Sequence, residues 1–120
     1  RNKQYISGHN RRKYKDSSQY KREWNHRNRL QRFQYKKKFI RDRKILLIKL
    51  SNEKCSRCGY SFDGVNDCIF DFHHLDSSKK LFSLNKATLN KKSWSSVLEE
   101  YKKCVMVCAN CHRLIHNNYN

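Results

Sequence analysis

Two Cys-x-x-Cys pairs constrain the fold of this sequence more than any other feature. They are Cys55 with Cys58 and, about 50 residues later, Cys108 with Cys111. Two thiolates at this spacing hold one ion in a tight turn, and four complete a tetrahedral zinc site. One ion would fasten the two segments together in a chain of 120 residues, which is short for a self-sufficient core. We therefore predict a structural zinc at these four cysteines and a reducing, intracellular location.

The remaining cysteines carry a different expectation. Cys68 and Cys104 lie outside both pairs and beside apolar neighbours, so we expect small core side chains without chemistry there. Gly59 follows the first pair directly, where a left-handed backbone conformation would close the turn.

Positive charge is concentrated in the first 50 residues. This segment holds 18 Lys or Arg and three acidic residues, whereas residues 51–120 hold 10 and seven. Such a segment repels itself and favours a polyanion partner, namely DNA, with RNA as the alternative. Interspersed aromatic rings can stack on bases, although a solvated tail or a localisation signal is the plainer interpretation. The residues that we expect to contact nucleic acid are Lys36, Lys37, Lys38, Arg41 and Arg113.

The distribution of glycine and proline predicts a two-part chain. Proline is absent and no glycine lies between Gly8 and Gly59, so one long helix or two should run from about residue 18 to residue 50. Residues 1–17 are expected to be disordered, and the apolar residues 45–50 to dock on the second part. We predict an α+β fold, with a basic arm over 1–50 and a compact domain over 51–120.

Hydropathy excludes a membrane protein. The longest apolar run extends only from Cys104 to Ala109, whereas a spanning helix needs roughly 20 apolar residues. No signal peptide is visible, and because Arg1 stands where an initiator methionine would, we expect residues to precede it.

Four histidines occur at spacings that suit a metal site. Residues 67–74 are predicted to form a strand that ends in His73 and His74, whose rings then point to opposite sides. His112 and His116, four residues apart on a predicted helix, project from one face within reach of a single ion.

The segment between these histidines is predicted to return the chain to the same place. Ser93 can cap a helix with an apolar face, and residues 105–107 form a short strand after it. The order strand, excursion, strand, helix should therefore bring all four histidines to one cleft. The expected apolar face of the capped helix comprises Trp94, Val97, Leu98 and Tyr101.

At this point the pattern resembles the HNH endonuclease family over about residues 53–117. The resemblance implies a small zinc-stabilised ββα-metal domain, here preceded by the basic, mainly helical arm. It also implies a metal-dependent endonuclease that hydrolyses DNA to 5′-phosphate and 3′-hydroxyl ends. The matching motifs are Phe72-His73-His74-Leu75-Asp76 and Cys108-Ala109-Asn110-Cys111-His112-Arg113-Leu114-Ile115-His116.

The resemblance assigns a role to each histidine. His74 would be the general base, while His73, His112 and His116 would hold the catalytic divalent ion. Magnesium or manganese is expected, and an all-imidazole donor set also accepts nickel, cobalt or zinc.

One position departs from the family. Lys103 stands where the family commonly has an Asn that holds the base in orientation, and Asn110, Asp71 or Asp76 could replace it. This departure leaves a second interpretation open, a zinc-stabilised DNA- or RNA-binding module with a decayed nuclease site. A third interpretation is an accessory subunit of a larger nucleic-acid complex.

Overall fold

The computed structural model describes residues 17–117 and confirms a small α+β fold that contains a two-stranded antiparallel sheet. The expectation of disorder for residues 1–17 falls, apart from Ser17, outside the described residues. The chain divides into two compact units, residues 1–36 and 37–120. The elements in chain order are α2 (Ser17–Arg27), α3 (Arg29–Leu50), η1 (Asp67–Ile69), β1 (Phe70–His74), η2 (Ser77–Lys79), α4 (Lys86–Lys91), α5 (Trp94–Tyr101), β2 (Cys104–Cys108) and α6 (Ala109–Asn117).

The basic segment forms two helices rather than one continuous helix. Asn28 separates α2 from α3, and its side-chain amide donates a hydrogen bond to the carbonyl of Trp24 at 2.8 Å. A side chain that bonds nearby backbone in this way competes with regular helix formation. The helical prediction from about residue 18 therefore agrees with the structure, with one break.

The second unit begins at Lys37, inside α3, and so before the change in charge at residue 50. Leu47 and Ile48 are fully buried in its core, and the partly buried Ile40 packs against the edge of that core. The expected docking of the apolar end of α3 is thus confirmed for Leu47 and Ile48, whereas Leu46 and Leu50 are exposed. Burial of apolar side chains, rather than charge, decides which part of this helix belongs to the second unit.

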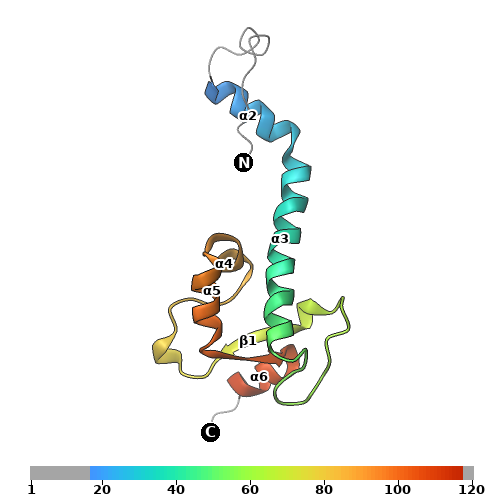
Figure 1. Cartoon of the computed structure of the whole chain (residues 1–120), viewed down its shortest axis with the longest axis vertical. Helices are drawn as coiled ribbons and strands as arrows, with labels where there is room; N and C mark the ends of the chain where they lie inside the picture. The colour runs from blue at the N-terminus through green and yellow to red at the C-terminus, as the bar shows by residue number, and fades with distance from the viewer. Residues whose placement is uncertain (1–16, 118–120) are drawn as a thin grey trace. The chain divides into compact units, whose positions relative to one another are not determined.

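The sheet positions the histidines by simple alternation along β1. Its two strands pair with Phe70 opposite Cys108 and His74 opposite Cys104. Phe72 meets Tyr101 of α5 on one face, whereas His73 meets the rings of α6 on the other. The sheet therefore lies between α5 and α6 (Figure 1).

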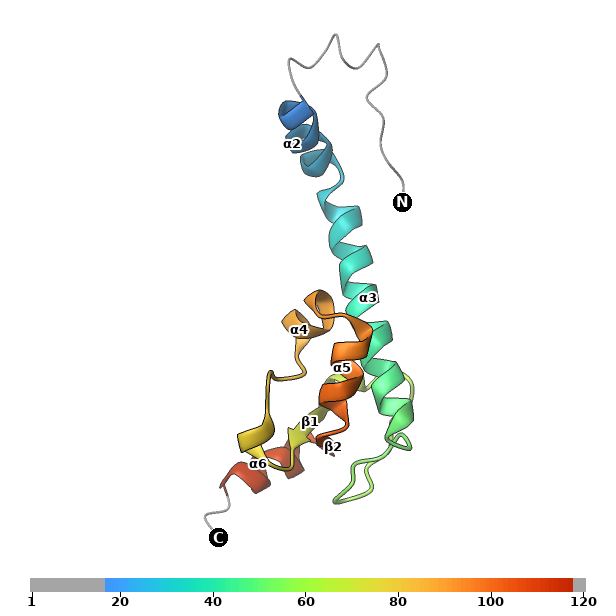
Figure 2. The same cartoon turned by 60° about the vertical axis from the view of Figure 1, so that its left-hand side comes forward.

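The segment that connects the two strands runs from β1 through η2 to α4 and returns along α5 to β2 (Figure 2). Asn85 caps α4 in a reciprocal arrangement with Thr88, and Ser93 caps α5 by accepting from the amide of Ser96. The predicted capping of α5 by Ser93 is confirmed. Val97 of the expected apolar face is fully buried.

One expectation about the first strand is wrong. Residues 67–69 form the 3₁₀ turn η1 and the strand begins only at Phe70. Because Cys68 lies before the strand, its side chain is not held on the same face of the sheet as that of Phe70. It is exposed rather than in the core. Cys104 is half-buried, and burial raises the pKa of its thiol to about 11.

Within residues 17–117, none of the helices combines the length and the apolar character that crossing a membrane requires.

Candidate functional site

The four cysteines of the two Cys-x-x-Cys pairs converge in the second unit. One sulfur from each lies within 4.8 Å of every other, and the sulfurs of Cys58 and Cys108 are 3.7 Å apart. The loop after α3 supplies the first pair, the end of β2 supplies Cys108, and α6 supplies Cys111. The group could hold a structural metal ion that joins these three parts of the chain.

Local backbone geometry builds the first half of this cluster. The backbone carbonyl of Cys55 accepts a hydrogen bond from the amide of Gly59 at 3.0 Å. Gly59 takes the expected left-handed conformation with φ of 78°. The amides of Arg57 and Cys58 point at the sulfur of Cys55. Burial raises the pKa of the Cys55 thiol, but hydrogen bonds from these and neighbouring groups outweigh it and bring the pKa to about 6.

Three of the four predicted histidines form a second cluster. His73 projects from β1, while His112 and His116 project from successive turns of α6. One ring nitrogen of each lies within 4.8 Å of the others, and the ring centroids of His112 and His116 are 4.6 Å apart. The spacing of four residues on a helix therefore has the expected effect, and the sheet brings the third ring to the same place.

Hydrogen bonds orient the rings of this cluster. His112 donates from Nδ1 to a carboxylate oxygen of Asp71 at 3.1 Å, which leaves its Nε2 on the side of His116, 2.9 Å from the Nε2 of that ring. Burial, together with the charges of the neighbouring imidazoles, lowers the pKa of His73. The neutral imidazole that results is the form that can ligate a cation.

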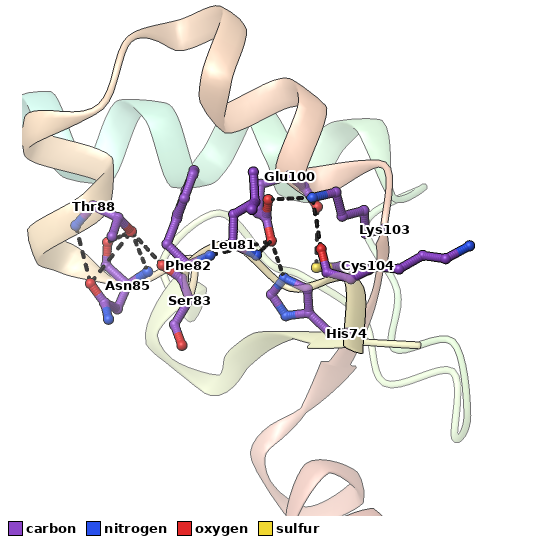
Figure 3. A network of polar contacts seen from close by, with 10 residues as sticks. His74, Leu81, Phe82, Ser83, Asn85, Thr88, Glu100, Lys103 and Cys104 are labelled. Atoms are coloured by element: carbon purple, nitrogen blue, oxygen red, sulfur yellow. Dashed lines mark hydrogen bonds and ion pairs between the residues drawn. The ribbon is translucent and has the colours of Figure 1, made fainter. Parts of the chain in front are cut away.

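The fourth histidine points to the opposite side of β1. His74 places Nε2 2.7 Å from Oε2 of Glu100 on α5, and its side chain is only 7% exposed. Lys103 does not reach His74, but its ammonium group lies 2.9 Å from the other oxygen of Glu100. Figure 3 shows His74, Glu100 and Lys103 in this network.

A cavity of about 310 Å³ is lined by side chains from both sides of the strand end. His74 and the three clustered histidines all line it, although His74 bonds α5 and the others face α6. A reacting group in this cavity could therefore contact both a cation at the cluster and the imidazole of His74. The remaining lining residues are Asp71, Phe72, Ser77, Lys80, Ser83 and Leu84.

The residues expected to contact nucleic acid are exposed, and some have partners. Lys38 lies 2.8 Å from Asp42, with both side chains more than half exposed. Arg41 binds Asp67 at 3.0 Å and the carbonyl of Gly64 at 3.2 Å, so its guanidinium holds the loop before β1. The other members of this set, Lys36, Lys37 and Arg113, are exposed on α3 or α6.

Sequence reasoning missed the partners of the histidines. Of the three residues considered as replacements for the family Asn, Asp71 bonds His112, Asp76 accepts from Ser78 in the cap of η2, and Asn110 is exposed.

The residue that contacts His74 is instead Glu100. A signal for it was present, since Glu100 follows the apolar Val97 by three residues and so falls on the buried face of the predicted helix.

Comparison of the chain with protein-family models, with curated proteins and with solved structures finds no match.

Proposed function

We propose that this protein is a metal-dependent endonuclease of the HNH type that hydrolyses phosphodiester bonds of DNA. One observation supports this proposal most. Three histidines gather as a candidate cation site, and His74 lines the same cavity from the neighbouring position of β1. The order β1, β2, α6 with the four cysteines beside it agrees with the resemblance described above.

The two clusters suit different ions. Four thiolates form a closed donor set, which is typical of structural zinc and leaves no position for a substrate. Three imidazoles beside an open cavity leave positions for a phosphate oxygen. Their nitrogen donors suit Ni²⁺, Co²⁺ or Zn²⁺, whereas the catalytic Mg²⁺ or Mn²⁺ that we propose follows from the resemblance and would take its remaining ligands from water and phosphate. Bound there, a divalent cation would supply Lewis-acid stabilisation of the charge on the scissile phosphate and the departing oxygen.

The residues of the chain supply the proton transfer. In the proposed reaction His74 removes a proton from a water molecule, whose oxygen forms a bond to phosphorus. The bond from phosphorus to the 3′ oxygen breaks, and that oxygen takes a proton from solvent. The products are a 5′-phosphate and a 3′-hydroxyl. Lys80, which lines the cavity, is placed to contact a phosphate oxygen.

The basic residues of α3 give this proposal its substrate class. Lys36, Lys37 and Lys38 are exposed and carry charge of the sign that phosphate backbones attract. We propose DNA as the partner, with RNA as the alternative. In the accessory-subunit alternative, the same lysines would dock the protein in a larger nucleic-acid complex.

Cleavage of supercoiled plasmid by the zinc-loaded protein, with Mg²⁺ or Mn²⁺ and with EDTA, tests the activity. We expect nicked or linear product that requires the cation and disappears in His74→Ala, while DNA affinity is retained. Leu75→Ala is the matched control, because Leu75 follows His74 directly and is 69% exposed. Protein that binds DNA but cuts none would favour a binding module, and a 3′-phosphate product would contradict the mechanism.

A further inference from the structure

Glu100 is a buried carboxylate in a position that otherwise belongs to the core. It lies on α5 one turn after the fully buried Val97, and only 1% of its surface is exposed. A carboxylate removed from water costs stability unless hydrogen bonds replace its hydration. A carboxylate on the buried face of α5 therefore needs hydrogen-bond partners that compensate for the lost water.

Donors surround both oxygens of this carboxylate (Figure 3). Oε1 accepts from the ammonium of Lys103 at 2.9 Å. Oε2 accepts from the amides of Leu81 and Phe82 at 3.0 and 3.5 Å, and it lies 2.7 Å from Nε2 of His74. The carboxylate thus ties the segment after η2 and the end of β1 to α5.

These contacts decide which nitrogen of His74 carries the hydrogen. Burial raises the pKa of Glu100, but the bonds from Lys103, Leu81, His74 and Phe82 outweigh it and lower the pKa to about 2. An ionised carboxylate only accepts hydrogen bonds, so Nε2 must donate. In a neutral ring Nδ1 is then free of hydrogen and able to take a proton.

We propose that Glu100 is the positioning residue for the general base, holding His74 in the Nε2–H tautomer so that Nδ1 accepts the proton. The inference rests on the proposed function and deepens it. Lys103 acts one step further away, because it holds Glu100 rather than the imidazole. The device is therefore an arrangement of three side chains, Lys103, Glu100 and His74.

The ring nitrogens of His74 report on this device without any cleavage. In zinc-loaded, ¹⁵N-labelled full-length protein, long-range ¹H–¹⁵N spectra distinguish the two tautomers, and His74→Gln identifies the signals of His74. We expect a wild-type ring with hydrogen on Nε2 and a mixture of tautomers in Glu100→Gln. Glu99→Gln is the matched control, since Glu99 is adjacent, 71% exposed and paired with Lys102 at the surface.

Cleavage kinetics give the second measurement. Glu100→Gln should lower kcat by about tenfold or more and KM little, because general base catalysis contributes about 10²- to 10⁴-fold in all. Glu99→Gln should retain the wild-type kcat. If Glu100→Gln does not fold, Glu100→Asp replaces it, since it keeps the charge but shortens the reach by about 1.5 Å, one carbon–carbon bond.

The outcomes separate this inference from the proposed function. A wild-type His74 with hydrogen on Nδ1, or a tautomer that the Glu100 variants leave unchanged, would overturn the positioning role even if kcat falls. If wild-type protein cuts no DNA while the tautomer depends on Glu100, the nuclease proposal fails and the control of the His74 ring by Glu100 stands.

Discussion

His112 donates its Nδ1 hydrogen to Asp71 across 3.1 Å, and this bond joins the last helix to the first strand beside the candidate cation site. Asp71 lies two residues before His73 on β1, so both side chains face α6. The bond fixes the ring of His112 with Nε2 toward His116. A carboxylate in this position also makes the imidazole a better electron donor to a cation.

Asp71→Asn should therefore weaken cation binding at the histidine cluster by about 10- to 100-fold, as expected for loss of a group that orients a ligand. Calorimetric titration of zinc-loaded protein with Mn²⁺ or Co²⁺ measures this affinity. Asp76→Asn is the control, because Asp76 caps η2 and bonds Ser78 instead. Equal affinity in wild type and Asp71→Asn would show that the bond does not serve the cation site.

Cys108→Ser should prevent the four-cysteine cluster from holding the proposed structural zinc and should unfold the second unit, because the ion would lose a ligand that joins β2 to the loop before β1. Zinc content by mass spectrometry and thermal unfolding by circular dichroism measure both effects. Cys68→Ser should leave both unchanged, since Cys68 is exposed and outside the cluster. Full folding of Cys108→Ser without metal would contradict the four-cysteine site.

Replacing Lys36, Lys37 and Lys38 by Gln should weaken DNA binding on every sequence and reduce its salt dependence. Each phosphate contact contributes ~0.9 to the slope of log affinity against log salt, so three contribute up to about 2.7. Fluorescence anisotropy at several salt concentrations measures this slope. Lys102→Gln, in the turn after α5 and outside this set, should leave it unchanged. An unaltered slope in the triple variant would remove these lysines from the interface.

Alkylation by iodoacetamide should distinguish the two unpaired cysteines in zinc-loaded protein. Cys68 is exposed and should react first, whereas the thiol of Cys104, with its pKa raised to about 11, is ionised to only about 10⁻³ at pH 8. Since the thiolate reacts, the rate at Cys104 should rise about tenfold per pH unit between pH 8 and 10. Peptide mass spectrometry follows each site, and similar rates at pH 8 would contradict the burial of Cys104.

Short-range patterns were the ones that sequence could predict. The cap at Ser93, the left-handed Gly59 and the shared helical face of His112 and His116 each depend on residues within four positions of one another. A local pattern misled at Cys68, where alternation predicted a strand and the chain forms η1 instead. A 3₁₀ turn of three residues leaves little periodic signal to distinguish it from the start of a strand.

By itself, the sequence determined the basic character of the first 50 residues, the α+β class and the sets of cysteines and histidines that could hold ions. Tertiary structure decided the rest. His74 contacts Glu100, and His112 contacts Asp71, only because β1 pairs with β2 and the sheet packs against α5 on one face and α6 on the other. These partners are 26 and 41 residues apart in the chain, and at such separations contacts follow from register and packing, which local spacing does not encode.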